Sequence, residues 1–115
     1  MTGTENGYFW HERLDVYRVA IELSAWVQRI SPRVPRGRAH LRDQLVRASD
    51  SVVLNIAEGA ATPDATGQKH YRIALRSVAE CDAAAHLLAV AGVRQAGEGR
   101  QLAGRVRSML ARMLR

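Results

Sequence analysis

Apolar positions in this chain recur at alternating steps of three and four residues, the spacing that lines up one face of a helix. The pattern predicts helices over about 11–30, 38–58, 64–91 and 100–114. Ser31 and Pro32 should end the first helix, because the residue before proline avoids the helical region. Gly59 and Gly92 should end the second and third, because glycine enters the left-handed end conformation without steric strain.

Four such helices joined by short connections predict an all-α fold, an up-down-up-down left-handed four-helix bundle. The 115 residues suit a single domain over 1–115. Residues 1–10 should be flexible, with Tyr8, Phe9 and Trp10 packing against the bundle end. Thr62 or Asp64 is expected to cap the third helix, and Gly104 to mark a close approach between helices.

The net charge is +6, and all but one of the cationic residues are arginine. A GC-rich genome would give the same bias, but the excess charge still favours an anionic partner. One arginine cluster surrounds the first connection and the start of the second helix: Arg33, Arg36, Arg38, Arg42 and Arg47. The other lies on or near the last helix: Arg94, Arg100, Arg105, Arg107, Arg112 and Arg115.

These arginines predict a salt-dependent contact with the phosphate backbone of RNA or DNA. The contact should be non-specific, because no aromatic residues interleave with the arginines to stack on bases. A solvated surface is the simpler interpretation of any run of charge. A protein–protein adaptor, whose basic face meets an acidic partner, is the alternative function.

Polar residues replace apolar ones on the inner stripes of two helices. They are Ser51, Asn55 and Glu58 on the second helix, and Ser77 and Glu80 on the third. We expect a structural polar layer that fixes helix register. A buried Glu would need a cationic partner, for which Arg18, Arg72 and Arg76 are candidates. A ligand or proton site is the alternative.

Catalytic and metal chemistry find little support in the sequence. Cys81 lies on an apolar stripe, where cysteine acts as a small hydrophobic residue. The histidines are scattered, and no metal-ligand spacing or glycine-rich phosphate loop occurs. We therefore expect no enzyme activity, metal or cofactor; an enzyme using Glu58 or Glu80 as a base is the weakest alternative. With no signal peptide and no membrane-spanning apolar run, a cytoplasmic location is expected.

Three segments carry a family resemblance: LDVYRVA at 14–20, LRDQLVRASDSVVLNIAEG at 41–59 and IALRSVAE at 73–80. They resemble the bacterial four-helix-bundle family of 23S rRNA intervening sequences over about residues 10–90. The long middle motif matches through Leu41, Gln44, Arg47, Ala48, Ser51, Asn55, Ile56, Ala57, Glu58 and Gly59. The chain departs from the family pattern at Ala60 and Ala61, where a Gly-Arg pair is usual, and at Arg76, where glycine usually allows close packing.

The resemblance implies a small non-enzymatic protein that assembles with itself, as a homopentamer. The related accessory variability determinant of diversity-generating retroelements forms similar bundles and binds nucleic acid and a reverse transcriptase through basic surfaces. RNA or DNA and a reverse transcriptase are therefore the partners that the resemblance implies.

Overall fold

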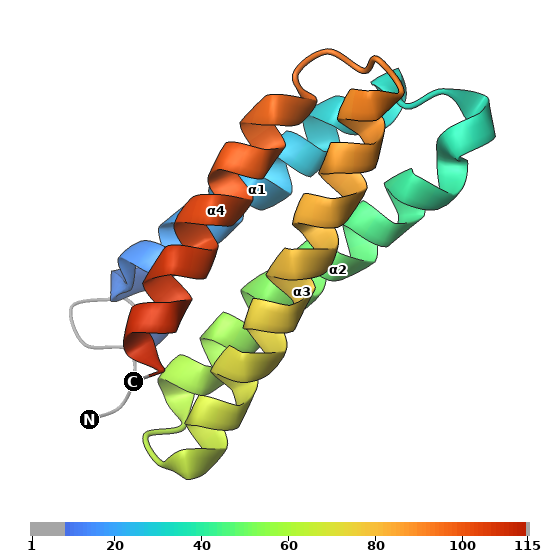
Figure 1. Cartoon of the computed structure of the whole chain (residues 1–115). Coiled ribbons are helices and arrows are strands. Elements are labelled where there is room, and N and C mark those ends of the chain that lie inside the picture. Colours follow the sequence, from blue (N-terminus) through green and yellow to red (C-terminus); the bar gives the residue numbers. More distant parts are fainter. Residues whose placement is uncertain (1–8, 115) are drawn as a thin grey trace.

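The computed structural model describes residues 9–114, which form a bundle of four long helices. These are α1 (Asp15–Ile30), α2 (Ala39–Ala61), α3 (Ala65–Val90) and α4 (Ala96–Met113). Each helix runs antiparallel to the next, and α4 packs back against α1 (Figure 1). Within residues 9–114 no strand occurs, so the predicted all-α up-down-up-down four-helix bundle is confirmed. Its left-handed sense stays a prediction.

The first helix begins later than expected, because the chain bends at Leu14. A short 3-10 helix, η2 (Trp10–Arg13), comes first, and Leu14 is extended with φ −85° and ψ 129°. η2 packs against α1 and α2, but Phe9 is 55% exposed and stacks on the His11 ring with 5.6 Å between centroids. The predicted packing of Phe9 is therefore wrong. The expected flexibility of residues 1–8, and the packing of Tyr8, lie outside the described residues.

Gly59 lies inside α2 and does not end it, so that prediction is wrong. The helix continues to Ala61, and Gly59 is buried against α3. A Cβ built on Gly59 would lie 2.5 Å from Cε1 of the Tyr71 ring. The glycine therefore allows the ring to approach the helix backbone, which sets how closely the C-terminal half of α2 meets the start of α3.

The connection from α2 to α3 is short and held by local contacts. Asp64 caps α3, accepting a hydrogen bond from the Thr66 backbone N–H at 2.9 Å, so of the two predicted caps Asp64 is the one used. A Cβ at Gly67 would collide with the carbonyl oxygen of Thr62. The reversal is thus too tight for any larger side chain at Gly67.

The last helix begins at Ala96, earlier than the expected residue 100. Gln95 precedes it with φ +69°, a left-handed conformation that non-glycine residues rarely adopt. The indole Nε1 of Trp26 donates to the Gln95 carbonyl at 2.9 Å and so holds this turn against α1. The predicted close approach at Gly104 is wrong, because nothing lies within 4 Å of a Cβ there. Gly99 makes that approach, against the Trp26 ring.

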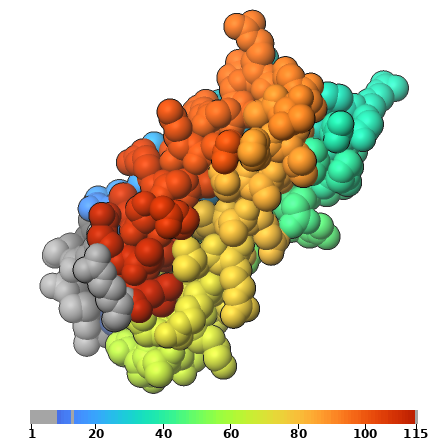
Figure 2. Space-filling view, in the orientation of Figure 1, coloured from blue at the N-terminus to red at the C-terminus, as the bar shows by residue number. Residues whose placement is uncertain are grey.

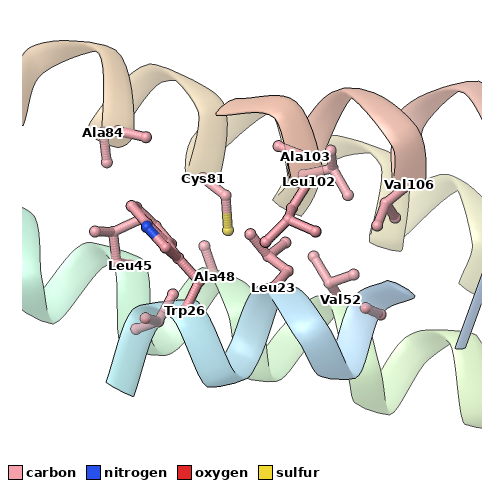
Figure 3. Packing of buried hydrophobic residues seen from close by; sticks show 14 of the residues in the cluster. Leu23, Trp26, Leu45, Ala48, Val52, Cys81, Ala84, Leu102, Ala103 and Val106 are labelled. Carbon is pink, nitrogen blue, oxygen red and sulfur yellow. The ribbon is translucent and has the colours of Figure 1, made fainter. Parts of the chain in front are cut away.

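All four helices contribute to one apolar core. Figure 3 shows Leu23, Leu45, Val52 and Val106 spread along the interior between the ribbons, and each side chain has an exposure of 0%. Burying each such side chain contributes about 1.5–3 kcal/mol. The apolar stripes are therefore used within the bundle, and the arginines and most other charged side chains are left on its outer surface.

Candidate functional site

The connection between α1 and α2 forms an arginine-rich end of the bundle. Two single-turn 3-10 helices build it, η3 (Ser31–Arg33) and η4 (Arg36–Arg38), and Pro32 and Pro35 keep the α-helix from continuing through it. The side chains of Arg33, Arg36 and Arg38 are exposed and make no ion pair within the described residues. We call these three side chains the end cluster.

The turn between α3 and α4 lies at the same end of the bundle as this connection (Figures 1 and 2). It adds the exposed Arg94. Two other arginines here already have acidic neighbours: Arg29 pairs with Glu98 at 2.7 Å, and Arg42 lies 3.6 Å from Asp43. The end therefore carries a clear excess of positive charge.

Two arginine rows run along α4, as the seven-residue spacing predicts. Arg105 and Arg112 line a shallow hollow of about 530 Å³ beside Gly104. Arg100 starts the other row and pairs with Asp82 of α3 at 3.0 Å. Arg107, one heptad further on the same face, is exposed. Arg105, Arg107 and Arg112 are thus available to an anionic partner, although they lie along the flank and not at the end.

Arg47 does not join the end cluster, contrary to the prediction. It lies in a groove between α2 and α3 and donates to Oε1 of Gln44 at 2.9 Å. The Gln44 amide in turn donates to Oε2 of Glu80 at 2.6 Å. The groove encloses about 240 Å³, and Ser51 and the buried Ser77 also line it. Gln44 thus bridges a cation on α2 to an anion on α3.

A chain of hydrogen bonds continues below this groove. Ser77 donates to Ser51 Oγ at 2.8 Å, and Asn55 Nδ2 donates to the Ser51 carbonyl at 2.9 Å and to its Oγ at 3.2 Å. His70 Nδ1 lies 2.9 Å from Asn55 Oδ1. Because the Ser51 carbonyl can only accept, Asn55 must present its oxygen to His70, and His70 must carry its proton on Nδ1.

Glu58 lies outside this network, and the prediction that it belongs to a buried polar layer is wrong. Its side chain is exposed. The core stripe of α2 continues from Val52 through Ile56. Two successive steps of three residues, through Asn55 to Glu58, rotate by about 120° away from Val52 on an α-helix. Asn55 therefore reaches the groove wall and Glu58 reaches solvent.

The other predicted members, Ser51, Asn55, Ser77 and Glu80, do come together between α2 and α3. Glu80 is exposed and takes Gln44 as its partner in place of the expected arginine. His70 also joins this group through Asn55, and the sequence did not predict it. It lies seven residues before Ser77, and this heptad spacing on the same helix face was the available signal.

The described residues contain neither an activated cysteine nor a cluster of metal ligands. Cys81 is buried, and burial, with smaller contributions from Glu80 and Asp82, raises the pKa of its thiol from 9.0 to about 12. The reactive thiolate is therefore scarce at neutral pH. Across residues 9–114, no three His, Cys, Asp or Glu side chains gather as a metal site would need. No helix in that range is both long enough and apolar enough to cross a membrane.

These features define the class: a small all-α bundle with a basic end, a basic flank on α4 and a groove of mixed charge between α2 and α3. The model of the 23S rRNA-intervening sequence protein family matches residues 12–115, and the chain belongs to that family. This match extends through α4, beyond the segments that carry the sequence motifs. No curated protein and no solved structure matches the chain.

Proposed function

We propose that this chain is a non-enzymatic, homo-oligomeric scaffold that binds RNA or DNA non-specifically through its arginine surfaces. The observation that carries the proposal is the end cluster of Arg33, Arg36 and Arg38, exposed and without ion pairs in the described residues. Arginine forms bidentate hydrogen bonds with phosphate, so a cluster of this kind fits a nucleic-acid backbone.

The helix that follows the end cluster strengthens the positive electrostatic potential at this end of the bundle. α2 begins with Arg38 at its cap, without a side-chain cap and without an acidic residue in its first turn. The first N–H groups of a helix carry partial positive charge, which adds to the charge of the arginines beside them. Arg105, Arg107 and Arg112 extend the basic surface along α4.

The groove between α2 and α3 supports self-association more than nucleic-acid binding. Arg47 and Glu80 place opposite charges in one groove, and a polyanion would be repelled by the carboxylate. Its polar lining includes Gln44, Ser51 and Ser77, through which the chain resembles its family. A second copy of the chain can match such a mixed-charge surface with its own, and a homopentamer is the assembly that the family resemblance implies.

A salt titration of nucleic-acid binding tests the proposal. We expect affinity for a fluorescent oligonucleotide to fall steeply with salt. Replacing Arg33, Arg36 and Arg38 together by alanine should weaken binding and flatten the log–log slope by about 2 to 3, because each phosphate contact contributes about 0.7 to 0.9.

A matched control is the triple replacement of Lys69, Arg72 and Arg76 by alanine. These three residues are exposed on α3, so replacing them removes the same charge as the first variant but from a different surface. The proposal fails if binding is absent at low salt, if it is independent of salt, or if the two triple variants lose the same affinity and slope.

The alternative is a protein–protein adaptor whose basic end binds an acidic partner or a reverse transcriptase. The same exposed arginines support it, since carboxylates also accept bidentate hydrogen bonds. A pull-down before and after nuclease treatment separates the two functions. A partner that survives nuclease treatment and is lost with the end cluster favours the adaptor, and a partner lost on nuclease treatment favours nucleic-acid binding.

A further inference from the structure

A hollow lies between the end of α1 and the start of α4, at the basic end of the bundle. It encloses about 270 Å³ and is lined by Trp26, Arg29, Ile30, Arg33, Gln95 and Glu98. Trp26 and Ile30 are 1% and 2% exposed, and they form an apolar floor beneath polar rim residues. An apolar floor with a few converging polar groups is the usual form of a small-ligand site.

The rim offers both hydrogen-bond donors and acceptors. Arg29 holds Oε1 of Glu98 at 2.7 Å, which orients the carboxylate and leaves it further lone pairs. Arg33 supplies guanidinium donors and makes no ion pair within the described residues. The side-chain amide of Gln95 can donate and accept. A ligand for this rim therefore needs donors and acceptors of its own.

This requirement separates a nucleobase from a bare phosphate. A phosphate offers acceptors almost alone, and the Glu98 carboxylate would repel it. The edge of a base offers both kinds of group; guanine places two neighbouring N–H donors beside a carbonyl acceptor, which match a carboxylate and a guanidinium. The volume equals that of roughly nine water molecules at about 30 Å³ each, enough for one heterocycle.

The surroundings fit a strand that brings the base to this place. Arg33 belongs to both the rim and the end cluster, so a base in the hollow would leave its phosphates close to arginine side chains. A base inside a duplex cannot enter, because its edge is paired and its faces are stacked, whereas single strands present splayed bases. The larger hollow beside Gly104 is lined by α4 alone and is too shallow to enclose a base.

We propose that the hollow over Trp26 is a nucleobase subsite, which takes one unstacked base, guanine in preference, from single-stranded RNA or DNA. Glu98 accepts hydrogen bonds from the base, Arg33 donates to its carbonyl oxygen, and Ile30 and Trp26 exclude water from beneath it. The inference rests on the proposed nucleic-acid binding and adds to it a preference for single strands and for one base.

Trp26 provides the measurement. The chain has two tryptophans, so a Trp10→Phe variant leaves Trp26 as the sole indole emitter. GMP, AMP, CMP, UMP, ribose 5-phosphate and inorganic phosphate are each titrated to low millimolar concentration while Trp26 emission is recorded. We expect saturable changes with nucleotides, the strongest with GMP, and none with ribose 5-phosphate or phosphate.

A Glu98→Gln variant tests the role of the carboxylate, with Glu22→Gln as a control that makes the same charge change at an exposed site on α1. We expect Glu98→Gln to weaken the affinity for GMP by about tenfold or more, because hydrogen bonds to a charged group are lost. Glu22→Gln should leave the affinity for GMP unchanged. Circular dichroism checks that every variant keeps its helices.

The subsite is overturned if no nucleotide changes the emission, if ribose 5-phosphate gives the same change as GMP, or if the two glutamine variants behave alike. A parallel titration with a fluorescent single-stranded oligonucleotide reports on the proposed function separately. Oligonucleotide binding without a nucleotide response removes the subsite alone, and loss of both removes the proposed function as well.

Discussion

Replacing Gly99 by alanine should destabilise the bundle, whereas the same change at Gly104, further along α4, should stabilise it. Both changes gain about 0.5–1 kcal/mol, because alanine has the higher helix propensity. They differ in what the new methyl group meets. A Cβ at Gly99 collides with the Trp26 ring, and a Cβ at Gly104 meets nothing within 4 Å.

The magnitude follows from how firmly Trp26 is held. The ring is 1% exposed, and its Nε1 donates to the Gln95 carbonyl at 2.9 Å, so it cannot turn aside without losing that bond. Forcing a methyl group into a packed core costs about 1–3 kcal/mol. Because the propensity gain cancels between the variants, Gly99→Ala should be less stable than Gly104→Ala by about 1–3 kcal/mol.

Urea unfolding followed by circular dichroism measures this difference, at one fixed protein concentration because assembly would add to the apparent stability. With a slope of about 1.5 kcal/mol per molar, the two midpoints should differ by about 0.7–2 M. Gly97→Ala is a second control in α4, since its Cβ also meets nothing. A Gly99→Ala midpoint equal to or above that of Gly104→Ala would refute the packing argument.

Three further predictions concern other contacts. Gln95→Gly should raise stability by up to about 1 kcal/mol by relieving the left-handed backbone at φ +69°, and an unchanged or lower urea midpoint contradicts this. Burial raises the pKa of the Cys81 thiol from 9.0 to about 12. The contribution of the buried, protonated thiol to the free energy of unfolding is therefore complete below pH 9 and is lost as the pH rises towards 12. Urea midpoints of Cys81→Ala should therefore fall less steeply with pH over this window than those of the wild type. Asn55→Leu should keep the helices but weaken assembly, measured by sedimentation; an unchanged assembly with a higher melting temperature argues against a role for the polar chain in register.

The periodicity of apolar residues was sufficient to predict the four helices and their order. It could not show which glycine faces a ring. Gly99 and Gly104 look alike in the sequence, and only the position of Trp26, far away along the chain, distinguishes them. The helix ends at Leu14 and Gln95 were missed for a related reason, because each depends on tertiary contacts in place of a local proline or glycine.

The sequence predicted the parts of the candidate site whose residues are close together along the chain. It did not predict the parts whose positions depend on contacts with other helices. Arg33, Arg36 and Arg38 gather because they adjoin one another in sequence. Glu58 was misplaced because a stripe drawn in steps of three rotates away from the core. Arg76, where the family usually has glycine, is exposed and so does not disturb the helix packing.

The start of α1 and the end of α4 lie together, since Leu14, Val16, Met109 and Met113 line one common hollow. The start of α1 and the end of α4 thus lie at the end of the bundle opposite the end cluster (Figure 1). A fluorescent protein or affinity handle fused before α1 or after α4 will point away from the end cluster, although Arg112 lies beside this hollow. A short peptide bridge across this hollow, with new ends opened in the connection at residues 31–38, would give a circularly permuted chain with the same core.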